Sequence, residues 1–358
     1  MGEIVVVTGA DGAVGRQVAT VAAAEPGVER VVVVGDLRHA VVPVAGAAAV
    51  VSAPFDLDDP RLHALVKGAT RLVHLGGRHG LDVDGTGGAD VDLVGTRALL
   101  SVLARVAALR TIVVLSSALV YGARPDNPVP LTEEAPVRPN PSIPAAVQRG
   151  QLEGMVTAWA AEHGATCALV RPCVVVGPEN GRWLARSPWS TAGPRVAGAD
   201  APVQFLHVDD LATAVVALCR ARVDGPVNAA PDGWLTGDQV KALKGPAPRI
   251  QLRRTLALRL ARVATRFGIA PADPTTVLAA SAPWVVANDR LRSLGWEPTF
   301  TNEEAYVDAD RGGPWARLTP RHRQHLALGA LGLVVVGVLG TLALLVRRRL
   351  RIRTSRGS

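Results

Sequence analysis

The stretch Glu3–Gly15, which reads EIVVVTGADGAVG, decides the fold. Its first six residues form a short β-branched run, and glycines then follow at three-residue spacing, at Gly9, Gly12 and Gly15. In a strand–turn–helix unit the first glycine allows a tight turn, the second lets backbone N–H groups approach a pyrophosphate, and the third lets the helix pack on the strand. The helix N-terminus then faces the phosphate charge. This stretch therefore predicts a dinucleotide site.

A carboxylate follows where such a site requires one. Asp36 ends the next strand-like run, 21 residues after Gly15, at the place where a carboxylate accepts hydrogen bonds from ribose hydroxyls. Asp36 would repel a 2′-phosphate, which favours NAD over NADP, although Arg38 nearby leaves NADP open. The residues of these two segments that we expect at the cofactor are Gly9, Asp11, Gly12, Ala13, Val14, Gly15, Asp36 and Arg38.

Strand-like and helix-like runs alternate through the first half of the chain. The strand-like runs are near-continuous in Val, Leu and Ile, which is typical of parallel strands covered by helices on both faces. We therefore predict an α/β fold, a Rossmann-type doubly wound parallel sheet, with a smaller C-terminal lobe for substrate, roughly 177–202 and 226–310. An Arg-rich helix is expected over Leu252–Phe267. The predicted strands are Glu3–Thr8, Arg30–Val34, Val50–Ala53, Arg71–Leu75, Thr111–Ser116 and Thr166–Arg171.

Over roughly residues 3–310 the sequence resembles the extended short-chain dehydrogenase/reductase family, the NAD-dependent epimerase/dehydratase group. The motifs that carry the resemblance are the Gly-x-x-Gly-x-x-Gly spacing, Asp56-Leu57, His74-Leu75-Gly76-Gly77, the run LSSALVYG at Leu115–Gly122, Arg171-Pro172, His207-Val208-Asp209-Asp210 and Leu294-Gly295-Trp296. The resemblance implies that Asp56 meets the adenine and that Leu57, Leu75, Gly76 and Gly77 also lie at the cofactor. It does not identify the substrate.

The resemblance also implies a Tyr-x-x-x-Lys pair for acid/base work, in which the lysine cation lowers the tyrosine pKa. The chain has two tyrosines, Tyr121 and Tyr306, and neither is followed four residues later by lysine. Counting back from Arg171 puts Ala145 at the tyrosine position and Arg149 at the lysine position. A methyl group cannot exchange a proton, whereas Arg149 can still contact a ribose or a phosphate.

Three residues remain as catalytic candidates: Ser117, Arg149 and His79. Ser117 stands at the family's serine position, where it either hydrogen-bonds a substrate carbonyl or hydroxyl or is only a strand-end hydroxyl. His79, in the loop after the fourth strand, is the candidate for a relocated base. Tyr121 is interpreted as structural, and His207 as packing or capping a helix. No metal site is predicted, since the metal-site motifs are missing.

The net charge of +8 belongs to the end of the chain. Residues 311–358 hold ten Arg and no Lys, Asp or Glu, whereas residues 1–310 hold 29 basic and 31 acidic side chains. A body that binds nucleic acid needs a basic face, so we exclude that class. The three cysteines form no CxxC pair, which argues against a disulfide scaffold.

Residues 326–346 form an uncharged run of 21 residues, LALGALGLVVVGVLGTLALLV. As a helix it would be about 31 Å long, which matches a hydrocarbon core of about 30 Å. We predict a transmembrane helix there, after the domain of residues 1–310 and a basic linker, 311–325, and before an Arg-rich tail, 347–358, at lipid headgroups. The alternative is a buried core helix. Because the N-terminus lacks a basic signal-peptide region, we expect the body in the cytoplasm, held by a single-pass C-terminal anchor.

Two functions remain open at this point. The first is a membrane-anchored NAD(P)-binding oxidoreductase or epimerase that acts on a sugar-nucleotide or lipid-like alcohol with an atypical acid/base. The alternative is a catalytically degenerate cofactor-binding sensor or scaffold at the membrane. The resemblance further implies a homodimer through the helices predicted at 88–108 and 145–163.

Overall fold

The computed structural model of the chain describes most of residues 1–310, namely 2–10, 12–35, 48–53, 56, 59–76, 93–178, 184, 195–196, 201–243, 251–253, 255–256, 258–259 and 274–310. Several residues predicted for the site lie outside the described part: Asp11, Asp36, Arg38, Leu57, Gly77 and His79. The predicted linker, membrane span and tail, 311–358, also lie outside it.

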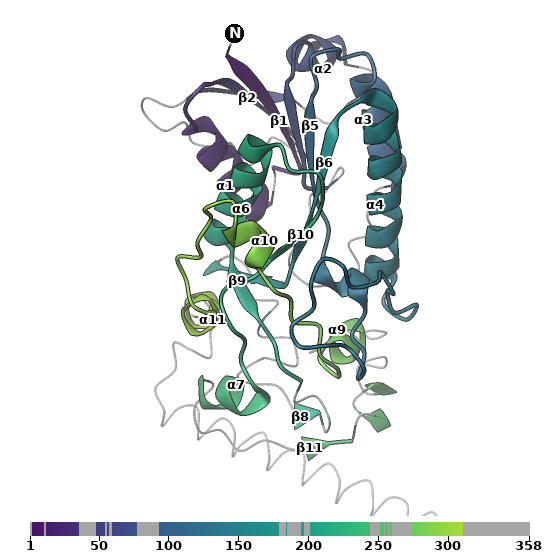
Figure 1. Cartoon of the computed structure of the whole chain (residues 1–358), viewed down its shortest axis with the longest axis vertical. Coiled ribbons are helices and arrows are strands. Elements are labelled where there is room, and N and C mark those ends of the chain that lie inside the picture. Colours follow the sequence, from purple (N-terminus) through teal and green to yellow (C-terminus); the bar gives the residue numbers. More distant parts are fainter. Residues whose placement is uncertain are drawn as a thin grey trace, which may run out of the picture.

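A seven-stranded parallel sheet forms the centre of the molecule (Figure 1), with strand order β10-β6-β5-β4-β1-β2-β3. On one side of β1 lie β2 and then β3. On its other side lie β4, β5, β6 and β10, in this order. The order therefore reverses between β1 and β4, and the predicted Rossmann-type parallel sheet is confirmed. The strands are β1 (Glu3–Thr8), β2 (Val28–Val34), β3 (Ala49–Ala53), β4 (Arg71–His74), β5 (Thr111–Leu115), β6 (Thr166–Pro172) and β10 (Gly225–Ala229).

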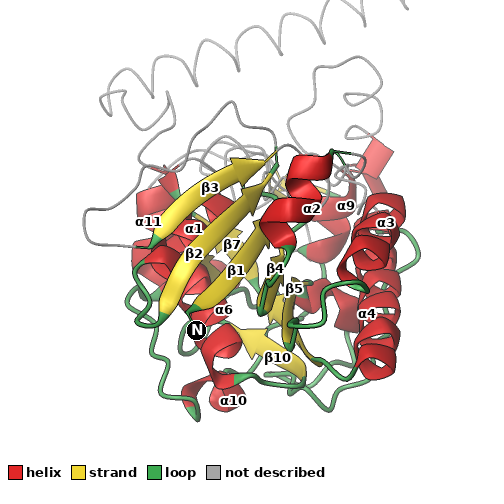
Figure 2. Cartoon of the chain, turned by 90° about the horizontal axis from the view of Figure 1, so that it is seen from above, coloured by secondary structure: helices red, strands yellow, loops and turns green. Residues whose placement is uncertain are grey.

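Helices cover both faces of the sheet, as Figure 2 shows. One face is packed by α1 (Ala13–Ala23) and α6 (Val208–Ala221). The other face is packed by α2 (Pro60–Val66), α3 (Leu93–Leu103) and α4 (Pro144–His163).

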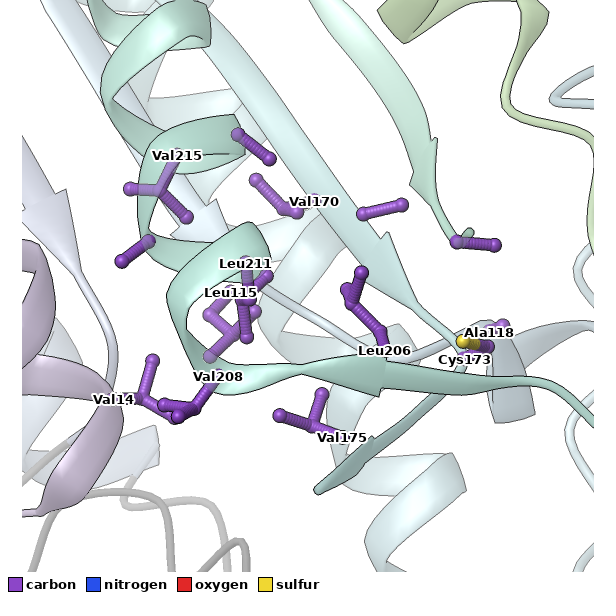
Figure 3. Packing of buried hydrophobic residues seen from close by; sticks show 14 of the residues in the cluster. Val14, Leu115, Ala118, Val170, Cys173, Val175, Leu206, Val208, Leu211 and Val215 are labelled. Carbon is purple, nitrogen blue, oxygen red and sulfur yellow. The ribbon is translucent and has the colours of Figure 1, made fainter. Parts of the chain in front are cut away.

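Side chains alternate between the two cores along each strand. In β1, Val5 and Val7 belong to the core beneath α1 and α6, whereas Val6 belongs to the core beneath α2, α3 and α4. This period of two is what a strand buried on both faces requires. Figure 3 shows the first core, where Val14 of α1 and Leu211 of α6 lie beside the strands.

Local sequence sets the helix ends. Asp59 accepts a hydrogen bond from the amide of Arg61 and so caps α2, which begins with Pro60. The long helix α4 begins with Pro144 and ends at Gly164, whose left-handed backbone suits glycine. The six predicted strands agree with the structure to within two residues, whereas the helix predicted to end at 108 ends at Leu103.

The second half of the chain also forms shorter elements outside the central sheet. It holds the strands β7 (Val174–Val176), β8 (Arg195–Val196), β9 (Phe205–His207) and β11 (Gln251–Leu252), and the helices α7 (Gly237–Leu243), α9 (Pro274–Ala279), α10 (Asp289–Arg292) and α11 (Asn302–Asp310). The boundary placed at residue 226 falls inside β10, because Gly225–Ala229 pairs with β6. The expected helix start at Leu252 is wrong, since this residue pairs with β8.

Within the part of the chain that the structure describes, we find no helix with the length and apolar character that a membrane crossing needs. The predicted span, 326–346, is not among the residues searched.

Candidate functional site

The turn between β1 and α1 has the geometry of an anion site. Gly9 takes a φ of +74°, which side-chain-bearing residues rarely adopt. A Cβ at Gly15 would lie 2.3 Å from the carbonyl oxygen of Gly9, so only glycine lets the helix approach the strand this closely. Gly12 is the N-cap of α1, and no side chain caps this helix end. The first-turn N–H groups of α1 can therefore bind a phosphate.

Neighbouring strand ends complete this edge of the sheet. The amide of Leu75, just after β4, donates to the carbonyl of Thr8, so Leu75 and Gly76 lie beside the turn of residues 9–15. Gly35 follows β2, and its amide donates to the carbonyl of Ala53 of β3, so Gly35 lies at the same edge. The structure thus brings together the described cofactor candidates Gly9, Gly12, Ala13, Val14, Gly15, Leu75 and Gly76, whereas Asp56 is exposed after β3.

The buried side chain of His74 links the end of β1 to α3 through hydrogen bonds. Each ring nitrogen of His74 hydrogen-bonds a threonine hydroxyl: Nδ1 with Thr8 at 2.7 Å and Nε2 with Thr96 at 2.9 Å. All three side chains are buried. Sequence patterns assigned His74 no role beyond a family motif. The sequence did show a polar residue, His74, at the end of an apolar strand. Because buried polar groups need hydrogen-bond partners, this position could have indicated a buried hydrogen-bonded histidine.

Ser117 and Arg149 meet the chain at the end of β5, but from different elements. Ser117 is half-buried and caps the short helix η1 (Ala118–Tyr121), because its Oγ accepts from the amide of Leu119 at 3.2 Å. Arg149 reaches over from α4, and its Nη1 donates to the carbonyl of Leu115 at 2.5 Å. The Ser117 hydroxyl proton is not used in the capping bond, so it can be donated to a ligand.

The position of the missing tyrosine lies in the first turn of α4. Ala145 stands one helical turn before Arg149, so both residues lie on the same face of the helix. Arg149 is 7% exposed. Burial lowers the pKa of Arg149 to about 10, and the negative charge of Glu153 partly opposes this change. The guanidinium therefore stays charged near neutral pH and cannot act as a general base there.

Tyr121 does not replace the missing acid. Its hydroxyl donates to Asn228 Oδ1 at 2.8 Å and accepts from Arg171 Nη1 at 2.9 Å. Burial raises the pKa of Tyr121, although the nearby Arg171 cation opposes this. Both capacities of the hydroxyl are thus used inside the fold, in agreement with its interpretation as a structural residue.

Arg171 is paired on all sides. It makes two parallel bonds to the carboxylate of Glu153, at 2.9 Å and 2.7 Å, which join β6 to α4. Asn228 on β10 continues the network, since its backbone amide donates to Glu133. A bidentate guanidinium–carboxylate pair of this kind is strongly oriented. The network fixes the position of α4, and with it the position of Arg149.

The imidazole of His207 is also engaged within the fold. His207 caps α6 by accepting from the amide of Asp209, and its other ring nitrogen lies 3.3 Å from Asp308. This agrees with the prediction that His207 caps a helix. Of the predicted catalytic residues, Ser117 and Arg149 lie at the end of β5, where a hydroxyl and a guanidinium can bind and orient a ligand.

The match to a family model extends over residues 5–230, and this model is the NAD dependent epimerase/dehydratase family. The chain belongs to this family. The predicted resemblance to extended short-chain dehydrogenases/reductases is confirmed. Its motifs at Gly9–Gly15 and Leu115–Gly122 lie at the ends of β1 and β5, which are separated by β4 in the same sheet.

The chain is distantly similar to a protein of Mycobacterium tuberculosis. An uncharacterized protein of Mycobacterium tuberculosis, Rv0501, is 26% identical over 240 residues, which cover 65% of this chain and 62% of that protein. The chain thus spans 62% of the length of this relative.

Two solved structures of similar fold were determined with NAD. The UDP-glucose 4-epimerase of Thermus thermophilus, in complex with NAD, is 19% identical, with a TM-score of 0.60 over 86% of this chain and 98% of that one. MoeE5, in complex with UDP-glucuronic acid and NAD, is also 19% identical, with a TM-score of 0.60 over 87% of this chain and 98% of that one. At such identities the likeness shows the fold, and the chemistry must be argued from this chain's own residues.

Proposed function

We propose that this family member is a membrane-tethered protein that binds NAD at the turn of residues 9–15 and holds a sugar nucleotide beside it without the family's proton exchange. The observation that carries the proposal is the pairing of Arg149 with the Leu115 carbonyl, one helical turn from Ala145. The cation of Arg149 and the methyl group of Ala145 occupy the positions of the family's lysine and tyrosine, and neither can exchange a proton near neutral pH.

The residues present fit a dinucleotide. The uncapped N-terminus of α1 supplies N–H donors, and the missing side chain at Gly15 lets the helix approach closely. Asp36, which the sequence places after β2, is proposed to accept the adenosine ribose hydroxyls, with NAD preferred over NADP. When bound, NAD supplies a nicotinamide ring that accepts or returns hydride. The chain's own contribution is to bind and orient this group and the ligand beside it.

The sugar-nucleotide part of the proposal rests on the family and on the half-buried serine. Similar folds are those of a UDP-glucose 4-epimerase and of MoeE5 with UDP-glucuronic acid. Ser117 offers its hydroxyl proton to a sugar oxygen, and Arg149 offers N–H donors that Leu115 does not use. A lipid-like alcohol remains a less supported ligand, because only the predicted membrane span favours it.

Membrane attachment is supported by the sequence of residues 326–346 and by the six arginines that follow them. We place the folded body in the cytoplasm and the Arg-rich tail, 347–358, at anionic headgroups. Removal of residues 326–358 is then expected to release the protein from membranes into the soluble fraction. A shortened chain that still sediments with membranes would refute a sole anchor there.

A second candidate is an oxidoreductase or epimerase with an atypical acid/base, and the free donor of Ser117 favours it. In that case Ser117 would pass a substrate proton to a base such as His79. Loss of turnover in both Ser117→Ala and His79→Ala, with NAD binding retained, would support this candidate.

The two candidates are separated by purifying the full chain in detergent. NAD and NADP binding is measured by calorimetry, and hydride transfer is followed by absorbance with a panel of sugar nucleotides. We expect NAD binding without turnover. The double variant Ala145→Tyr with Arg149→Lys restores the family's pair and is the matched gain-of-function probe. Turnover by the unmodified chain would overturn the first candidate, and failure to bind NAD would overturn both.

A further inference from the structure

A line of buried hydrogen bonds joins α3 to the residue that precedes the nucleotide turn. Thr96 lies in the first turn of α3, and its hydroxyl contacts Nε2 of His74 at 2.9 Å. Nδ1 of His74 contacts the hydroxyl of Thr8 at 2.7 Å, and Thr8 and His74 are paired positions of β1 and β4. One imidazole ring therefore holds α3 and Thr8 in a fixed relation.

The imidazole ring fixes this relation by its shape and not by its charge. In a neutral imidazole one nitrogen donates and the other accepts, and a threonine hydroxyl can do either, so both bonds form in either tautomer. The two nitrogens lie in one rigid ring, and all three residues are at most 2% exposed. Because buried polar groups without partners are unfavourable, a shift of α3 away from the ring would be unfavourable as well.

The turn itself tolerates little displacement of Thr8. Gly9, the next residue, has a left-handed backbone, and its amide donates to the carbonyl of Val34. The carbonyl oxygen of Gly9 lies so close to α1 that a Cβ at Gly15 would be 2.3 Å from it. The N–H groups at the start of α1 therefore keep their direction only if Thr8 and Gly9 stay in place.

We propose that Thr96 and His74 are positioning residues for NAD, which act through Thr8 and do not touch the nucleotide. This inference rests on the NAD-binding part of the proposed function. The two bonds hold the turn and the N-terminus of α1 in the binding arrangement before NAD arrives, so less conformational freedom is lost when NAD binds. Loss of the bond at Thr96 should then weaken NAD binding, although His74 and Thr8 separate this hydroxyl from the turn.

The test compares the same substitution at two buried threonines. Thr96→Val removes the bond to His74 and keeps the size of the side chain. Thr111→Val is the matched control, because Thr111 is equally buried but begins β5, at the opposite ends of the parallel strands, where its hydroxyl accepts from Thr166. NAD is titrated into the full chain in detergent by calorimetry, and urea unfolding measures the stability of each variant.

We expect Thr96→Val to raise the dissociation constant for NAD about three- to tenfold, the range that the loss of one hydrogen bond gives. Thr111→Val should leave the dissociation constant unchanged, although both variants should lose stability to a similar degree. Equal NAD affinity in the wild type and Thr96→Val would overturn the inference. An equal loss of affinity in both valine variants would also overturn it, because the effect would then follow stability and not position.

A double-variant comparison shows whether Thr96 acts through His74. His74→Phe removes both bonds of the ring, so Thr96→Val should have no further effect on NAD affinity in that background. A further loss of the full size would mean that Thr96 affects the nucleotide by another route, and it would overturn the inference. If His74→Phe does not fold, Thr8→Val takes its place, because it breaks only the bond to Nδ1.

The result for the wild type separates this inference from the proposed function. If the wild type binds NAD and all variants bind it equally well, the positioning role is wrong and the proposed function stands. If the wild type does not bind NAD, the proposed function fails, and the inference that rests on it fails as well.

Discussion

Two buried arginines lie at the same edge of the sheet, and the fold treats them differently. Arg171 is held by Glu153, by Tyr121 and, through Tyr121, by Asn228. Arg149 is held by one backbone carbonyl. The partners of Arg171 all belong to the fold, whereas no carboxylate of the described residues lies within ion-pair distance of Arg149.

The pKa directions of the two arginines agree with this comparison. Burial lowers the pKa of Arg171, but the hydrogen bonds and charge of Glu153 outweigh burial and leave the pKa raised. For Arg149 burial dominates, and the pKa falls to about 10. The fold therefore favours the charged form of Arg171 and opposes the charged form of Arg149.

Removal of the satisfied arginine should have the largest effect. Arg171→Met leaves the Glu153 carboxylate buried without its partner, so we expect the free energy of unfolding to fall by about 3–5 kcal/mol. Urea unfolding of the full chain, followed by circular dichroism, measures this loss. The exposed control Arg105→Met should change stability by less than about 0.5 kcal/mol. A loss of similar size in both variants would contradict a special role for the Arg171 network.

Removal of the unsatisfied arginine should have the opposite sign. Arg149→Met removes a buried charge that forms no ion pair with the described residues, so we expect a gain in unfolding free energy of about 1–4 kcal/mol. The same urea experiment measures it. A clear loss of stability would mean that the fold itself satisfies Arg149, and the contrast between the two arginines would disappear.

The hydroxyl of Tyr121 is the next point at which the comparison can be tested. Tyr121→Phe leaves a donor of Arg171 and an acceptor of Asn228 unpaired, so we expect a loss of about 1–3 kcal/mol. NAD affinity should not change, because this hydroxyl faces the structural network. If the variant lost cofactor affinity at unchanged stability, Tyr121 would belong to the ligand site.

The smallest expected effect is a pH dependence. Because the pKa of Arg149 is lowered in the folded state, the unfolded state binds more protons, and the stability of the wild type rises as pH increases through about 10. The gap between Arg149→Met and the wild type should therefore narrow by about 0.4 kcal/mol between neutral pH and the pKa of Arg149. Paired urea curves over this range measure the gap, and an unchanged or widening gap would show that the folded state does not lower the pKa of Arg149.

The central sheet could be predicted from sequence because its signals are local. Runs such as Val31–Val34 are buried on both faces, and the glycines of the first turn are set by close backbone approach. The helix predicted at 145–163 agrees with α4, which begins at Pro144 and is capped by Gly164. In contrast, Leu252 pairs with a distant strand, and this could not be predicted because strand pairing is not encoded in a local pattern.

The site was only partly predictable for the same reason. Family motifs placed Ser117, Arg149 and the turn, and they revealed the substitution at Ala145. The partners of each side chain come from elements far apart in the chain, as in the bond from Tyr121 to Asn228. The buried Ser116 hydroxyl, which has no hydrogen-bond partner among the described residues, was not predicted, because its surroundings are known only from the structure.

The most direct test of the account is a calorimetric titration of the full chain with NAD, beside Gly15→Val, whose side chain would overlap the Gly9 carbonyl. The account predicts saturable binding to the wild type at micromolar to millimolar NAD, in the range usual for nucleotide sites, and its loss in the variant. No saturable binding to the wild type, or equal binding to both proteins, would contradict a nucleotide site at this turn.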